Sequence, residues 1–94
     1  MDDKSFRVAA LEEKYSHQIM LSLLNNPRQK KTELLQSISK SSCMPRRLKV
    51  LEEAGFVEVE RDTFDNNIKW VCLTERGTRI AELLAKIQYE ASRD

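Results

Sequence analysis

The spacing of apolar residues changes after Gly55, and no other feature constrains the possible folds as strongly. Before this glycine the apolar positions recur every three or four residues, which is typical of amphipathic helices. After it the period falls to two in "FVEVERD" and again in "IKWVCLT", with the polar turn "TFDNN" between them. This alternation predicts a two-stranded β-hairpin over residues 56–73 and places the chain in the α+β class.

Four helices are predicted around the hairpin, at residues 8–25, 31–38, 43–54 and 75–90. Pro27 cannot continue the first helix, and Thr74 is a suitable N-cap for the last one. The fold is therefore expected to be mostly helical. With 94 residues, the chain is expected to form a single domain whose core extends over about residues 8–90.

Pro45 lies just inside the third predicted helix, in the segment "SSCMPRRLKVLEEAGF". A proline is tolerated there because the first N–H groups of a helix have no partner within the helix. Its position indicates that the helix starts at Ser41 or Ser42. Helical spacing leaves a cationic side exposed and directs the apolar residues to the core; these are Met44, Leu48 and Leu51.

Positive charge is concentrated in the middle of the chain, although the net charge is only +1. Residues 27–51 contain seven cations and one anion, whereas the segments before and after them are net negative. Such a block predicts a basic surface for a polyanion. The alternative is a solvated, lysine-rich face that has no partner.

Two segments resemble parts of winged helix-turn-helix regulators. The segment "RRLKVLEEAGFVE" (residues 46–58) is similar to the recognition-helix-to-strand region of MarR-like, ArsR-like and small archaeal winged-helix regulators. The segment "LTERG" (residues 73–77) is similar to the region that follows the wing in those proteins. The resemblance covers about residues 8–90. It implies three helices, a β-hairpin wing and a C-terminal helix, with the third helix in a DNA major groove.

The expected function is sequence-specific binding of double-stranded DNA by a transcriptional regulator. Arg46 and Arg47 have no acidic residue four positions away on either side, so both are predicted to be free for a ligand. The wing is net acidic and is expected to add little to phosphate binding unless its cations gather at its tip. The predicted DNA-binding residues are Arg28, Lys30, Lys31, Lys40, Ser41, Ser42, Pro45, Arg46, Arg47, Lys49, Asn66, Asn67 and Lys69.

The first and last helices carry more apolar residues than a minimal winged domain needs. We expect a two-fold homodimer built from these helices. The alternative is that the same residues cover the core of a monomer. The predicted interface residues are Phe6, Val8, Leu11, Tyr15, Ile80, Leu84 and Ile87.

Other classes of function have little support in the sequence. One histidine and two cysteines without CxxC spacing predict no metal site, and no cofactor loop or catalytic constellation is visible. No apolar run approaches the length of a membrane span, and the N-terminus "MDDKSFRV" lacks the features of a secretory signal, so a cytoplasmic protein is expected. The main alternative is a winged-helix module that binds another protein. RNA binding is disfavoured because the basic block contains no aromatic residue.

Two residues have more than one interpretation. Trp70 either covers the hairpin or contacts a partner subunit. Cys43 lies beside Arg46 and Arg47, and is either a redox sensor or a small, half-buried helix residue.

Overall fold

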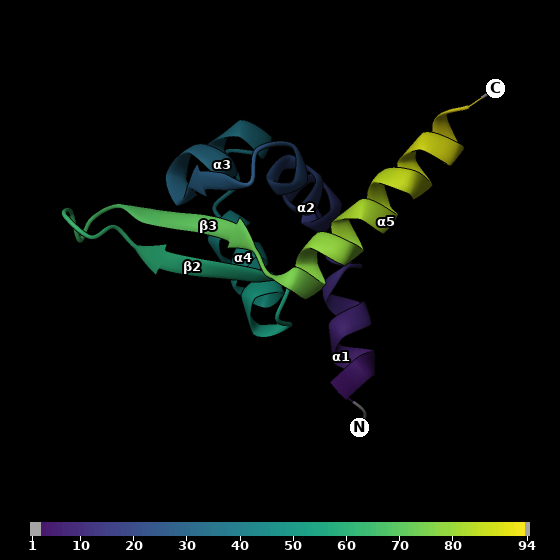
Figure 1. The fold of residues 1–94 in the computed structure, drawn as a ribbon, viewed down its shortest axis with the longest axis horizontal. Coiled ribbons are helices and arrows are strands. Elements are labelled where there is room, and N and C mark those ends of the chain that lie inside the picture. Colours follow the sequence, from purple (N-terminus) through teal and green to yellow (C-terminus); the bar gives the residue numbers. More distant parts are fainter. Residues whose placement is uncertain (1–2, 94) are drawn as a thin grey trace.

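The computed structural model describes residues 3–93, with side chains from residue 7 onward. Its elements follow in the order α1 (Asp3–Ala10), α2 (Ser16–Asn25), β1 (Arg28–Lys30), α3 (Lys31–Ile38), α4 (Met44–Glu53), β2 (Val57–Arg61), β3 (Lys69–Leu73) and α5 (Glu75–Ser92). Figure 1 shows α2, α3 and α4 gathered at one end of the β2–β3 hairpin, which projects away from them. The α5 helix packs along α2 and extends beyond the body of the protein. The α+β, mostly helical class is confirmed.

A three-stranded antiparallel sheet, in the order β1-β3-β2, replaces the two-stranded sheet predicted from the sequence. The strands β2 and β3 pair from Val57 opposite Leu73 to Arg61 opposite Lys69. The strand β1 adds three residues to the other edge of β3. The sequence does not predict β1 because "RQK" is short and polar and has no alternation of its own. It forms because the edge of β3 offers unpaired backbone groups beside the chain that leaves α2.

The prediction of one helix over residues 8–25 is wrong, because the structure divides this segment into α1 and α2. Tyr15 adopts a left-handed conformation with a φ of 70°, which a right-handed helix cannot contain. The buried Ser16 hydroxyl donates to the Ala10 carbonyl at 2.9 Å and satisfies an acceptor at the end of α1. Leu11 and Tyr15 still pack against the core from the connecting segment, so the apolar spacing continues across the break.

The hydrophobic core lies between α2, α3, α4, α5 and the inner face of the sheet. The predicted core stripe of α4 is confirmed, since each of its three apolar residues is at most 1% exposed. The opposite face of α4 is therefore free of the core. The largest fully buried apolar side chains are Ile19, Met20, Leu23, Leu34, Met44, Leu48, Leu51, Val57 and Val71.

The joint between α4, β2 and α5 sets the direction of the hairpin relative to α4. Gly55 follows the C-cap of α4 with a φ of 83°, a conformation that favours glycine. The Thr74 hydroxyl donates to the Gly55 carbonyl at 2.6 Å and accepts from the Gly77 N–H at 2.9 Å. Thr74 is thereby confirmed as the N-cap of α5. One side chain thus ties the end of α4 to the start of α5 and holds the hairpin beside the exposed face of α4.

Candidate nucleic-acid interface

The α4 helix starts later than the sequence predicts. Its N-cap residue is Cys43, which provides no side-chain hydrogen bond. The Ser41 hydroxyl instead accepts the Cys43 N–H at 3.2 Å and stabilises a turn before the helix. The predicted start at Ser41 or Ser42 is therefore wrong in detail. Pro45 still lies in the first turn, where its missing N–H leaves no helical hydrogen bond unmade.

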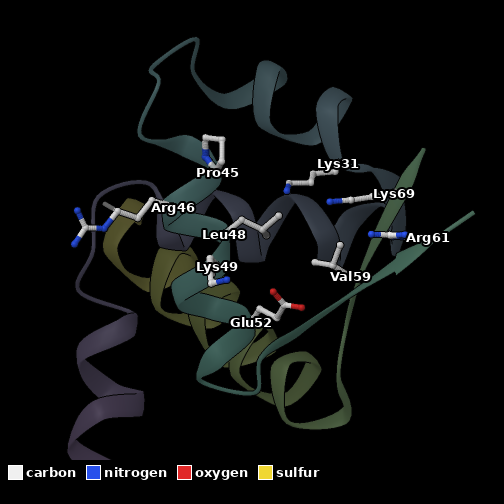
Figure 2. Close-up of a pocket in the computed structure, with 9 residues that line it drawn as sticks. All are labelled: Lys31, Pro45, Arg46, Leu48, Lys49, Glu52, Val59, Arg61 and Lys69. Carbon is white, nitrogen blue, oxygen red and sulfur yellow. The ribbon is translucent and has the colours of Figure 1, made fainter. Parts of the chain in front are cut away.

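An open cavity of about 480 Å³ lies between the exposed face of α4, the start of α3 and the hairpin (Figure 2). Five cations and one carboxylate line it, and two aliphatic side chains and a proline supply its apolar surface. Like charges gathered around one cavity create a positive potential, which attracts a polyanion. We call this cavity the cationic groove; its lining residues are Lys31, Pro45, Arg46, Leu48, Lys49, Glu52, Val59, Arg61 and Lys69.

The cations are spread around the groove and remain available to a ligand. In Figure 2, Lys31 and Lys69 lie toward the hairpin side of the groove, whereas Arg46 points away at the far end. Within residues 7–93, no ion pair joins any of the five cations to a carboxylate. Glu52, which lies on α4 three residues after Lys49, is likewise unpaired there. A ligand with spaced negative charges fits this arrangement better than a single small anion.

Arg61 lines the groove although it is not among the DNA-binding residues predicted from the sequence. It is the cross-strand partner of Lys69, so β2 and β3 each bring one cation to the same edge. The alternation of inward and outward side chains along β2 indicates this placement of Arg61. Val57 and Val59 are directed to the inner face, and Arg61, two residues further on, shares that face beyond the end of the core. Two cations of the otherwise acidic hairpin therefore face the same space as α4.

A second cavity, of about 320 Å³, adjoins the groove and includes Lys30 and Asn67. It shares three lining residues with the groove. The β1 strand ends at Lys30 immediately before α3 begins, which brings this lysine beside the hairpin loop. The structure thus brings together seven of the predicted DNA-binding residues: Lys30, Lys31, Pro45, Arg46, Lys49, Asn67 and Lys69.

The other six predicted DNA-binding residues lie outside both cavities. Arg47 forms an ion pair with Glu13, from the segment between α1 and α2, so the prediction that it is free for a ligand is wrong. Helical spacing could not reveal this contact, because the partners are 34 positions apart. Arg28 stacks on Trp70, with its guanidinium carbon 4.2 Å from the ring centroid. Exposed positions in the α3–α4 turn or at the hairpin tip are occupied by Lys40, Ser41, Ser42 and Asn66.

Solved structures with the same arrangement include repressors and transcription regulators. The adhesin competence repressor AdcR from Streptococcus pyogenes has a TM-score of 0.72 at 21% identity, over 84% of this chain and 59% of that chain. AbfR, in a reduced form bound to DNA, has a TM-score of 0.68 at 23% identity, over 96% of this chain and 68% of that chain. A SlyA-like transcription regulator from Listeria monocytogenes has a TM-score of 0.76 at 18% identity, over 95% of this chain and 59% of that chain.

These similarities establish a shared fold. The chain has the winged-helix fold. Residues 57–73 form its wing, and α3 and α4 form its helix-turn-helix pair. The resemblance to MarR-like regulators is confirmed at the level of fold, although the chain spans only 59% of the length of AdcR. No protein-family model and no curated protein sequence matches the chain.

The wing loop is anchored by Trp70 and Asp62. The Trp70 indole Nε1–H donates to Asp62 Oδ1 at 2.8 Å, while Arg28 covers the indole ring. These contacts support the interpretation of Trp70 as a side chain that covers the hairpin. Asp62 also accepts the backbone N–H groups of Phe64 and Asp65. The hydrogen bond from Trp70, followed by that from Phe64, lowers the pKa of the Asp62 carboxyl below its usual value.

The fluorescence of Trp70, the chain's single tryptophan, is expected to report the protonation of Asp62. Because the pKa of Asp62 is lowered in the folded chain, its stabilising contribution is present above the unfolded-state pKa and is lost as the pH falls through the folded-state pKa. The midpoint of the fluorescence transition is therefore expected at a pH below 3.8, the ordinary pKa of an aspartate carboxyl. Asp62→Asn should abolish the transition while circular dichroism still shows a folded chain. An unchanged transition in this variant would contradict the assignment.

The predicted dimer-interface residues divide into packed and exposed ones. Leu84 is only 8% exposed and belongs to the core, so its assignment to an interface is wrong. The α5 helix packs along α2 and turns Leu84 inward, whereas helical spacing alone cannot tell which part of an apolar stripe is covered. The residues that are partly buried against the same core are Leu11, Tyr15 and Ile80.

Val8 and Ile87 are the predicted interface residues that remain exposed, at 59% and 62%. Leu83 and Tyr89, on α5, are also exposed, although they are not among the predicted interface residues. Phe6 lies outside the described side chains. Apolar surface on α1 and α5 is thus available to a second copy, but over fewer of the predicted residues.

The two cysteines lie in different surroundings. Cys43 is exposed, so its interpretation as a half-buried residue is wrong. Burial raises the pKa of the Cys72 thiol, and the charge of Glu58 raises it further, which disfavours the thiolate. No group of three potential metal ligands occurs among the residues that the structure describes. Within the same residues, no helix has the length and hydropathy that crossing a membrane requires.

Proposed function

We propose that this protein is a cytoplasmic transcription regulator that binds double-stranded DNA sequence-specifically as a homodimer. The cationic groove carries the proposal, because its five cations lie on α3, α4 and the wing around one exposed helix face. Such an arrangement suits the regularly spaced phosphates of a duplex. AbfR, which has the same fold, is solved in complex with DNA, and this supports the same use of the fold here.

In the proposed complex, α4 enters the major groove, which is wide enough to admit a helix. Arg46, near the N-terminus of α4, is positioned to donate two hydrogen bonds to a guanine. Lys31, Arg61 and Lys69 lie to the wing side of α4 and would neutralise phosphates along the flanking strand. Glu52 has no ion-pair partner among the described residues and can accept a hydrogen bond from the amino group of a cytosine.

Selection of duplexes from a random double-stranded library tests this function without a known operator. The wild-type protein should enrich a sequence motif with two related half-sites about 34 Å apart, one turn of DNA. Absence of enrichment, together with no retention of the protein on duplex DNA at low salt, would contradict the proposal. It would favour the alternative of a winged-helix module that binds another protein.

Dimerisation is proposed through the exposed apolar residues of α1 and α5. At micromolar concentration, sedimentation should show a species of twice the 11.0 kDa chain mass. Ile87→Glu should shift it to the monomer without loss of helix content, because Ile87 is 62% exposed and its replacement disturbs no core packing. Arg76→Glu, an exposed position at the other end of α5, is the control and should stay dimeric. A wild-type protein that sediments only as an 11.0 kDa species would exclude the dimer.

A further inference from the structure

The ring of Phe64 is the most exposed large apolar group of the described residues, at 97%. It lies in the wing loop, which hydrogen bonds hold in a defined conformation. Asp62 Oδ2 accepts the N–H of Phe64 at 3.0 Å and that of Asp65 at 3.1 Å. Asp65 Oδ1 in turn accepts the Asn67 N–H at 2.9 Å. A structured loop therefore presents an aromatic ring to solvent, where it gains nothing for the stability of this chain.

The two acidic residues of the loop are used within it. The carboxylate of Asp62 is shared between two backbone N–H groups and the Trp70 indole, and Asp65 serves as an acceptor for the loop backbone. The Asp62 N–H also closes the loop by donating to the Ile68 carbonyl at 2.8 Å. These hydrogen bonds hold the turn in one conformation and fix the direction in which the tip of the wing points.

The loop lies next to the cationic groove. Arg61 is the last residue before the loop, and Lys69 is the first residue after it. Both side chains line the groove. Asn67 and Ile68 from the loop line the adjoining cavity beside the start of α3. If α4 occupies the major groove and Arg61 and Lys69 hold the neighbouring phosphates, the tip of the wing reaches past that strand toward the minor groove.

We propose that Phe64 is an apolar DNA contact that enters the minor groove and wedges against a base step beside the segment held by α4. This inference rests on the proposed function and deepens it. Apolar side chains placed in this way unstack a step partially and bend the duplex. Steps of pyrimidine followed by purine deform most easily, so the protein favours such a step at the position of the wing.

The test compares three variants on duplexes selected by the wild-type protein, with affinity measured over a series of salt concentrations. Phe64→Ala should weaken binding about tenfold at every salt concentration, which corresponds to the loss of an aromatic interface contact. It should leave the salt dependence unchanged, because an uncharged ring displaces no counterions. Lys69→Ala should instead reduce the slope of log affinity against log salt by about 1. Thr63→Ala, at an exposed neighbouring position of the same loop, is the matched control.

Additional readouts separate a DNA contact from a damaged loop. The bend of the bound duplex, measured by energy transfer between dyes at its ends, should decrease in Phe64→Ala and not in Thr63→Ala. Trp70 fluorescence should be unchanged in Phe64→Ala, because the ring contributes nothing to the bond between Trp70 and Asp62.

Equal affinity and equal bending for Phe64→Ala and the wild type would overturn the inference and leave the proposed function intact. A wild-type protein that binds no duplex at low salt would overturn both.

Discussion

Gly77→Ala is expected to destabilise the protein strongly, and more than Gly55→Ala. A Cβ atom at this position would lie 1.8 Å from the Phe56 carbonyl oxygen and 2.8 Å from its carbon. These are backbone atoms, and the same carbonyl accepts the Thr74 N–H at 3.1 Å, so it cannot move without disrupting the joint between the wing and α5. Alanine favours a helix over glycine by only about 1 kcal/mol. We expect a net loss of about 3 kcal/mol or more, a large part of the stability of a small domain.

Thermal unfolding followed by circular dichroism measures this loss, and Gly55→Ala is the matched control. A Cβ at Gly55 meets no atom within 4 Å, but the φ of 83° remains unfavourable for alanine. The cost there should be about 1–2 kcal/mol. Gly55→Asn should cost less, because asparagine tolerates the left-handed conformation. If Gly77→Ala proved as stable as Gly55→Ala, the described packing of α5 against Phe56 would be incorrect.

The double variant Arg46→Ala/Lys49→Ala is expected to lose about a hundredfold or more in affinity for its selected DNA. It removes two of the five groove cations from the face of α4 that the core leaves exposed. Arg46→Ala alone should lose discrimination at one base position, because a paired contact to guanine is worth about 1–3 kcal/mol. Lys31→Ala should weaken selected and unrelated duplexes alike, since phosphate contacts carry no sequence information.

Arg79→Ala provides the matched loss of a cation away from the groove. Arg79 lies on α5, where it forms an exposed ion pair with Glu75. Removal of this cation should leave DNA affinity and sequence preference within experimental error of the wild type. A comparable loss in Arg79→Ala and the double variant would show that binding depends on total charge, and would contradict a defined interface.

The elements that frame the site could be predicted from local patterns. Pro45 and Gly55 mark the ends of α4. The alternation of apolar and polar residues in the segment from Gly55 to Thr74 identifies the wing. The local rules fail where a distant partner decides the structure. The strand β1 forms because β3 has a free edge, and the left-handed Tyr15 interrupts an apolar spacing that runs on unbroken in the sequence.

The same distinction explains which site residues were predictable. Arg46 and Lys49 follow from the faces of one helix, and the structure places both in the groove. Arg47 belongs to that helix too, but its pairing with Glu13 depends on how α1 joins α2. To predict Arg61 as a groove residue, one needs the register of β2 against β3 in addition to the alternation of side chains within β2.

The salt dependence of DNA binding by the wild-type protein tests the central claim most directly. If Lys31, Arg61 and Lys69 of the cationic groove neutralise phosphates, log affinity should fall linearly with log salt concentration, with a slope of about −3 per subunit. The slope counts displaced ions and needs no knowledge of the operator. A flat dependence, or no detectable binding at low salt, would contradict the account of this groove as a DNA interface.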